Sequence, residues 1–175
     1  YKKICTERVF NSQIEFLKPI VNEWDFLFEG IQGDYVFDKD SRGDNWIVNK
    51  EGIVALDFED KGMVRQEYDT VKLIEESGLS SKNDEARFKI LKAYANSYGI
   101  KNYEEFLRGH LSAAFPITLS YVLYSQHHNI GNNSTRISFL ENARHCMNLL
   151  NEQRTKSLEK YIDMTIDMLQ KPVQI

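Results

Sequence analysis

Cysteine is scarce in this chain, which has two cysteines among 175 residues. Cys5 and Cys146 lie far apart and in no metal-ligand spacing, so the sequence predicts no disulfide framework and a reducing, cytoplasmic location. Excess basic charge is lacking as well, since the formal net charge is -4. No global positive field therefore exists to attract nucleic acid or an anionic membrane, and neither is an expected partner.

Long apolar runs are also missing. The longest weakly polar stretch, residues 111–124, contains Pro116 and falls short of the roughly 20 residues that a membrane-spanning helix needs, so it is expected to be a core helix. The first residues show no basic region followed by an apolar run, so the sequence predicts no signal peptide. With 42% apolar and 27% charged residues, residues 1–175 are expected to form one globular domain.

Hydrophobic periodicity predicts a mainly α-helical fold. Apolar residues recur every three to four positions over residues 6–30, and the same period returns at about Gln66 and defines a helical subdomain over residues 66–170. Its last part, residues 138–169, is expected to form one or two amphipathic helices, in which Met164 and Met168 are interpreted as core residues.

Helix-capping signals refine this subdomain. Ser81 to Asp84 has the form of a capping box before a helix that ends at Tyr98, and Asn102 is expected to cap a helix that begins at Tyr103. His110 and His145 stand alone in helical context and are interpreted as structural or surface residues. The adjacent His127 and His128 are interpreted as a polar helix end rather than a metal pair, because neighbouring helical residues face different ways.

Two short apolar runs, residues 46–48 and 53–56, predict a small β-hairpin with a four-residue connection. The hairpin is expected to pair Val48 with Ile53. In that register, Asn45 and Asp57 emerge at the same open end. The fold class is therefore mainly α with a small β-hairpin.

The segment around this hairpin is strongly acidic. Residues 34–60 hold eight carboxylates and three cations, a net charge of -5. Such charges repel one another unless water or a bound cation compensates them. Mg²⁺ prefers oxygen ligands and takes only one or two carboxylates beside water and substrate phosphates, so Asn45 and Asp57 are the candidate metal ligands.

Two motifs give the segment a specific resemblance. Asp40-Ser-Arg-Gly-Asp-Asn45 has the Asp-x-x-x-x-Asn spacing of the kinase catalytic loop, and Leu56-Asp57-Phe58-Glu59 follows on the next strand, where kinases carry their metal-binding Asp. Glu59 replaces the Gly of the Asp-Phe-Gly motif, so the segment resembles the aminoglycoside and choline phosphotransferase branch of the protein-kinase-like fold. Residues 34–60 would then be the catalytic loop and metal-binding hairpin of its larger, C-terminal lobe.

The resemblance implies transfer of the γ-phosphate of ATP or GTP to a hydroxyl of a small molecule. Asp40 would accept or orient the hydroxyl proton, and Arg42 would stand near the transferred phosphate. Asn45 and Asp57 would hold the Mg²⁺ ions that bridge the phosphates, and Asp69 would brace the catalytic loop. Asp38 stands where the family usually has His, and Lys39 where it has Gly or Arg.

Three further carboxylates have two interpretations. They could attract a cationic acceptor such as an amino sugar or a quaternary amine, or they could be solvated loop charges. These carboxylates are Asp34, Glu59 and Asp60.

No Gly-rich phosphate loop or strand Lys precedes the helix expected over residues 6–30, so the smaller lobe is expected to come from an upstream segment. The chain alone is then expected to bind nucleotide poorly, and its uncovered lobe face is expected to favour self-association or a partner. If it bound nucleotide tightly, Lys2, Lys3 or Arg136 would have to supply the phosphate clamp.

Two alternatives use the same residues. The chain could be a non-catalytic kinase-like lobe that binds a regulatory partner. Residues 35–40 also resemble the strand and Asp-x-Asp nucleophile of haloacid-dehalogenase-type phosphatases, although a hairpin follows them instead of a loop and a helix. An EF-hand loop starting at Asp38 is rejected, because Asn49 stands where its bidentate Glu should be.

Overall fold

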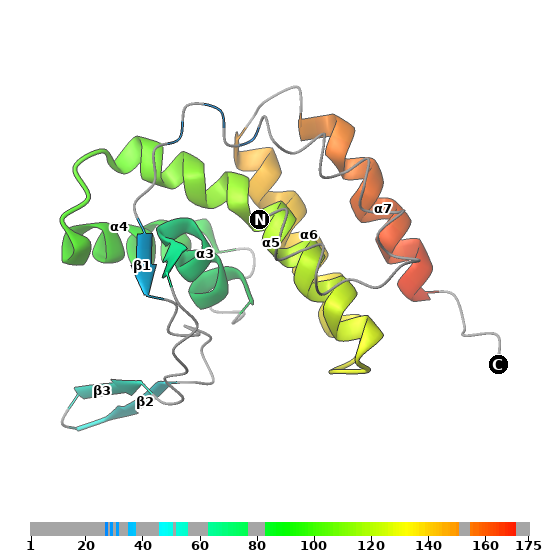
Figure 1. The fold of residues 1–175 in the computed structure, drawn as a ribbon, viewed down its shortest axis with the longest axis horizontal. Coiled ribbons are helices and arrows are strands. Elements are labelled where there is room, and N and C mark those ends of the chain that lie inside the picture. The colour runs from blue at the N-terminus through cyan, green and yellow to red at the C-terminus, as the bar shows by residue number, and fades with distance from the viewer. Residues whose placement is uncertain are drawn as a thin grey trace. The chain divides into compact units, whose positions relative to one another are not determined.

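The computed structural model is mainly helical, as the sequence predicts (Figure 1). The residues that it describes are 27, 29, 31, 35–37, 46–50, 52–55, 63–76, 83–150 and 155–170. The helix predicted over residues 6–30 lies outside them, apart from Leu27 and Glu29. Contacts divide the chain into two compact units, one of residues 30–113 and one of residues 1–29 with 114–175. Nothing in the structure tests the predicted single domain, which stays a prediction.

Two pairs of short antiparallel strands belong to the unit of residues 30–113. β1 (Tyr35–Phe37) pairs with β4 (Met63–Arg65), and β2 (Trp46–Asn49) pairs with β3 (Gly52–Ala55). In the second pair Val48 lies opposite Ile53, and pairing continues to Asn49 opposite Gly52. The connection is therefore shorter than the predicted four residues, because short turns match the right-handed twist of paired strands.

The helices of this unit follow the strands. α3 (Gln66–Val71) begins directly after β4 and continues as a π-helical turn, η3 (Lys72–Glu76). α4 (Asp84–Tyr98) ends at Gly99, whose φ of 67° is the left-handed conformation that glycine adopts most easily. α5 (Tyr103–His127) contributes its first part to this unit. A cluster of buried apolar side chains joins η3, α4 and α5 and consists of Ile74, Leu91, Ala95 and Phe106.

The two helix starts differ in how well the sequence predicted them. Asn102 caps α5 as predicted: its Oδ1 accepts the backbone N–H of Glu105 at 3.2 Å, and its Nδ2 donates to the Glu105 carboxylate at 3.0 Å. The capping box that begins at Ser81 is wrong. Asn83 is the N-cap of α4, and its Oδ1 accepts the backbone N–H of Ala86 at 3.0 Å. Asn is as effective a cap as Ser, so the helix begins later than the box predicts.

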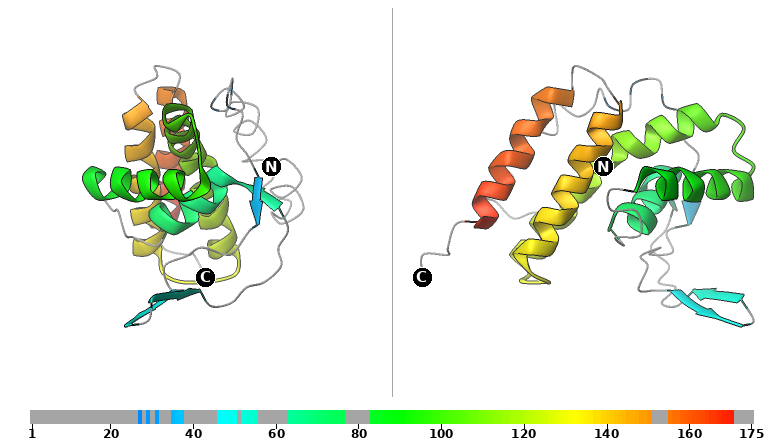
Figure 2. Two further views of the ribbon diagram at one scale, coloured as in Figure 1. Left: turned by 90° about the vertical axis from the view of Figure 1, so that its left-hand side faces the viewer. Right: turned by 180° about the vertical axis from the view of Figure 1, so that it is seen from behind.

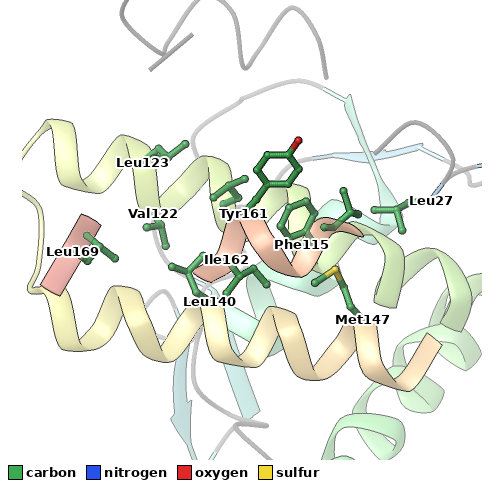
Figure 3. Packing of buried hydrophobic residues seen from close by; sticks show 11 residues of the cluster. Leu27, Phe115, Val122, Leu123, Leu140, Met147, Tyr161, Ile162 and Leu169 are labelled. Carbon is green, nitrogen blue, oxygen red and sulfur yellow. The ribbon is translucent and has the colours of Figure 1, made fainter. Parts of the chain in front are cut away.

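The other unit contains the rest of α5, together with α6 (Asn133–Leu150) and α7 (Lys156–Gln170). α6 and α7 pack side by side (Figure 2). Their buried side chains form the larger apolar core with residues of α5 and with Leu27 (Figure 3). From α6 and α7 this core takes Leu140, Met147, Leu158, Tyr161, Ile162 and Leu169.

The interpretation of two methionines as core residues is wrong. Met164 is 51% exposed and Met168 is 40% exposed, although both lie in α7. Leu158, Ile162 and Leu169 are buried and follow the period of one helix face, while Met164 lies two positions after Ile162 and so faces the other way. The helical period, rather than the apolar character of Met, decides the burial here.

Candidate functional site

Most residues of the predicted phosphotransfer site lie outside the described part of the chain. Among the candidates the structure describes Asp69 alone. The residues outside the description are Asp34, Asp40, Arg42, Asn45, Asp57, Glu59 and Asp60. The site can therefore be built from the strands that flank these residues and from the surroundings of Asp69.

The two strand pairs are nested along the chain. The outer pair is β1 with β4, and the inner pair is β2 with β3. Residues 38–45 connect β1 to β2, and residues 56–62 connect β3 to β4. Both acidic connections therefore run between the same two strand pairs.

The strand registers show that the residues flanking the two connections lie opposite one another. Phe37, the last residue before one connection, lies opposite Met63, the first residue after the other. At the far end of the connections, Trp46 lies opposite Ala55. Opposed residues in an antiparallel pair have Cα atoms about 4.5–5.5 Å apart, so each end of one connection begins close to an end of the other.

Asp69 is held inside the fold by a residue from another helix. It lies on α3 and is 3% exposed. The phenol oxygen of Tyr94, on α4, donates a hydrogen bond to its Oδ2 at 2.9 Å. A buried carboxylate needs such donors, because without them its loss of hydration would be costly.

The Tyr94 ring is itself fixed by its neighbours. It stacks on Tyr98, with ring centroids 4.5 Å apart, and on Phe106, with centroids 5.7 Å apart and ring planes 4° apart. Burial, followed by the charge of Asp69 and the hydrogen bond to it, strongly raises the pKa of Tyr94. The phenol therefore keeps its proton and acts as the donor to Asp69.

A buried ion pair lies in the same unit. The guanidinium of Arg87, on α4, donates from Nε to Oε1 of Glu75 at 2.8 Å and from Nη2 to Oε2 at 3.1 Å. Arg87 also pairs with Asp84 at the start of α4. This paired geometry supplies hydrogen bonds to both carboxylate oxygens, which a buried charge requires.

His110 extends this network to α5 and α3. It is fully buried, and its Nε2 lies 2.8 Å from Oε1 of Glu75 while its Nδ1 lies 2.9 Å from the hydroxyl of Thr70. Burial alone would raise the pKa of Glu75, but the hydrogen bonds and charges of His110 and Arg87 outweigh it and lower that pKa to about 2. Glu75 is thus ionised at neutral pH, and His110 has the structural role predicted for it.

Sequence reasoning missed this network, apart from the structural role of His110. Glu75 and Arg87 are separated by 12 positions and Glu75 and His110 by 35, so no helical or strand period relates them. The available signal was local: Glu75 falls on the helical segment after Gln66, where the buried face includes Val71 and Ile74. A charged residue on such a face predicts a partner but does not identify it.

α3 and α5 approach each other closely at Gly109. A Cβ atom added there would lie 2.8 Å from Oε1 of Glu67 and 2.9 Å from its Cγ. Glu67 is 2% exposed and accepts two hydrogen bonds of 3.0 Å from Arg65. Glycine at position 109 leaves room for the Glu67 side chain where it lies, and a Cβ there would require that side chain to shift.

Two other sequence candidates are tested by the structure. Arg136 is buried and donates to the backbone oxygens of Ser125 and Ile130 at 2.8 and 2.9 Å, so it ties down the chain at the end of α5. His127 is the last residue of α5, and it and His128 are exposed, as expected of a polar helix end.

Two kinds of feature are absent from the described residues. Within these residues, no group of three or more His, Cys, Asp or Glu side chains is arranged to hold a metal ion. Asn45 and Asp57 lie outside these residues. None of the helices in the described ranges combines the length and apolar character that crossing a membrane requires.

Comparison with models of protein families, with curated protein sequences and with solved structures gave no match for this chain.

Proposed function

We propose that the chain carries the catalytic centre of a kinase-like phosphotransferase, which moves the γ-phosphate of ATP or GTP to a hydroxyl of a small molecule. The observation that carries this proposal is the nested pairing of the strands. In this pairing Phe37 lies opposite Met63 and Trp46 lies opposite Ala55. These residues flank the connection that contains Asp40 and Asn45 and the connection that contains Asp57. These three residues are the ones that the kinase resemblance requires in one place.

The inner strand pair supports the metal ligands in particular. Trp46 lies opposite Ala55. Asn45 directly precedes Trp46, and Asp57 follows Ala55 by two residues. Consecutive Cα atoms are about 3.8 Å apart, so only a short length of chain separates each proposed ligand from this opposed pair. In the proposal both residues would hold Mg²⁺.

In the proposed reaction Asp40 accepts or orients the proton of the acceptor hydroxyl. The hydroxyl oxygen forms a bond to the γ-phosphorus while the bond to the β-phosphate oxygen breaks. Asn45 and Asp57 would hold Mg²⁺, which would supply positive charge to offset that of the phosphates, and Arg42 would stand near the transferred group. Asp34, Glu59 and Asp60 favour a cationic acceptor, because carboxylates near a site raise the local concentration of cations.

The first test is calorimetry with ATP in the presence of Mg²⁺, on residues 1–175 and on the longest natural form of the protein. Asp57→Asn keeps the shape of the side chain and removes its charge, so we expect Mg²⁺-dependent nucleotide binding to weaken while the fold persists. Glu51→Gln, on the turn side of the same hairpin, is the matched control and should bind as the parent does. Unchanged magnesium dependence in Asp57→Asn would contradict the assignment.

The second test distinguishes the proposed phosphotransfer from a haloacid-dehalogenase-type phosphatase reaction. In the longest natural form Asp40→Ala should lower kcat by about 10²-fold or more with little change in nucleotide affinity, because a base acts in the transition state. The control is Asp38→Ala. A large loss from Asp38→Ala with a nearly silent Asp40→Ala would favour a phosphatase instead.

A further inference from the structure

Two exposed methionines lie next to each other on α7. Among the described residues, four large apolar side chains are well exposed, and two of them are Met164 at 51% and Met168 at 40%. Residues four positions apart on a helix are neighbours on its surface, so the two thioether side chains form one apolar patch. The opposite face of α7 is buried, with Tyr161, Ile162 and Leu169 in the apolar core (Figure 3). The patch therefore takes no part in that core.

The exposed charged side chains of α7 are segregated by sign. Lys156 and Lys160 are exposed in the first half of the helix, and Asp163 and Asp167 are exposed in the second half. The last turn contains Asp167 and no basic residue, although the helix dipole favours a basic side chain there. Asp163 pairs with Arg144 of α6, whereas Asp167 enters no ion pair within the described part of the chain. A cation supplied from outside the helix would therefore be favourable beside Asp167.

We infer that this face of α7 docks against the same face of a second copy of the chain, as an antiparallel pair of helices. An antiparallel copy brings the basic half of one α7 beside the acidic half of the other, and it also opposes the two helix dipoles. A parallel copy would instead place Lys160 beside Lys160 and Asp167 beside Asp167. The inference does not depend on the proposed phosphotransfer.

The spacing of residues along α7 fits such a pair. If the twofold axis passes at Met164, this residue faces its counterpart in the second copy, as a twofold contact requires. Lys160 and Met168 are each four positions from Met164, so Lys160 of one copy lies level with Met168 of the other. The methylene stem of Lys160 then covers the thioether, while its ammonium group reaches Asp167, one residue away along that helix. The symmetry repeats this contact on the other side of the axis.

The expected association is weak. A contact made by one helix from each copy is small beside the roughly 1,200–2,000 Å² that stable interfaces bury, so the dimer should form at high concentration and dissociate on dilution. The methionine patch supplies most of the affinity, whereas the charges beside it set the antiparallel direction. Each substitution acts twice in a twofold dimer, which enlarges its effect.

The test is sedimentation equilibrium of the longest natural form of the protein, from about 1 to 200 μM, a range suited to a weak dimer. The parent should associate reversibly. Met164→Ser removes the central apolar contact from both copies and should raise the dissociation constant about tenfold or more. Ile130→Ser is the matched control, because Ile130 is 49% exposed but lies between α5 and α6. This control should associate as the parent does.

A charge exchange tests the direction of the pair. Lys160→Asp and Asp167→Lys should each weaken association about tenfold or more, because each brings like charges together twice in the dimer. The double variant that carries both changes should associate nearly as the parent does, since exchanging both charges keeps them complementary. All three variants change exposed side chains only, so their free energies of unfolding, measured in urea on the monomer, should stay near that of the parent.

Loss of association in Met164→Ser and its recovery in the double charge variant would together support the α7 pair. A chain that stays monomeric over the whole concentration range overturns the inference. In such a monomer, a large loss of stability from Met164→Ser would show that another segment of this chain covers the patch. Association that Met164→Ser leaves unchanged would mean that another face makes the dimer. A double variant as weak as the single variants would rule out the antiparallel pairing of Lys160 with Asp167.

Discussion

Arg87 and Glu75 form a fully buried ion pair in which both carboxylate oxygens accept a hydrogen bond from one guanidinium group. The side chains are 0% and 1% exposed, and they join α4 to η3. Arg144 and Asp163, which join α6 to α7, form a contrasting pair with an N–O distance of 2.6 Å and side chains 25% and 62% exposed. Since burial decides what breaking such a pair costs, the two pairs give a direct comparison.

Arg87→Met should lower the free energy of unfolding by about 3–5 kcal/mol, because it removes the guanidinium that donates to both oxygens of the buried Glu75 carboxylate. Arg144→Met should cost less than about 1 kcal/mol, since water replaces the lost partner of an exposed carboxylate. Urea unfolding of both variants at neutral pH measures the difference. Equal losses would mean that Glu75 is compensated by other groups.

The pH dependence of the free energy of unfolding should reflect the ionisation of the Glu75 carboxyl group. Its pKa is about 2 in the folded chain, against an ordinary value of 4.5. The unfolded chain thus binds the proton at higher pH, so the contribution of Glu75 is fully present above about pH 4.5 and is lost as the pH falls towards 2. A shift of this size corresponds to up to about 3 kcal/mol. The advantage of the parent over Glu75→Gln in unfolding free energy should shrink across that window, and a constant difference would contradict the lowered pKa.

Gly109→Ala should destabilise the chain, although Ala usually stabilises a helix interior by about 1 kcal/mol relative to Gly. The added Cβ would lie 2.8 Å from a carboxylate oxygen of Glu67, which Arg65 holds in place. We expect a loss of about 1–3 kcal/mol, the usual cost of overpacking. In the background Glu67→Ala the same substitution should cost much less. Simple additivity of the two changes would show that the close approach is relieved elsewhere.

The start of α4 can be tested with two substitutions. Asn83→Ala should lower the free energy of unfolding by about 1 kcal/mol, because it removes the acceptor of the Ala86 N–H. Ser81→Ala should change it little. Thermal unfolding of both variants distinguishes the cap seen in the structure from the capping box predicted by the sequence, which requires the opposite order.

Local signals were sufficient for much of the secondary structure. The start of α3 at Gln66, the Asn102 cap and the burial of Leu140 and Leu158 follow from residues within a few positions of one another. Backbone hydrogen bonding and the helical period act over that range, so the sequence predicts them directly. Met164 follows the same rule, since its position in the helical period leaves it exposed although its side chain is apolar.

The features of the candidate site also fall into those determined by local sequence and those determined by packing. The sequence alone determined the spacing from Asp40 to Asn45 and the acidic character of residues 34–60, and these carry the proposed chemistry. Tertiary structure alone decided that Tyr94 meets Asp69 and that Arg87 meets Glu75. Those contacts arise because packing brings separate helices together, and a buried charge is stable only where that packing also supplies its partner. No pattern within one helix contains this information.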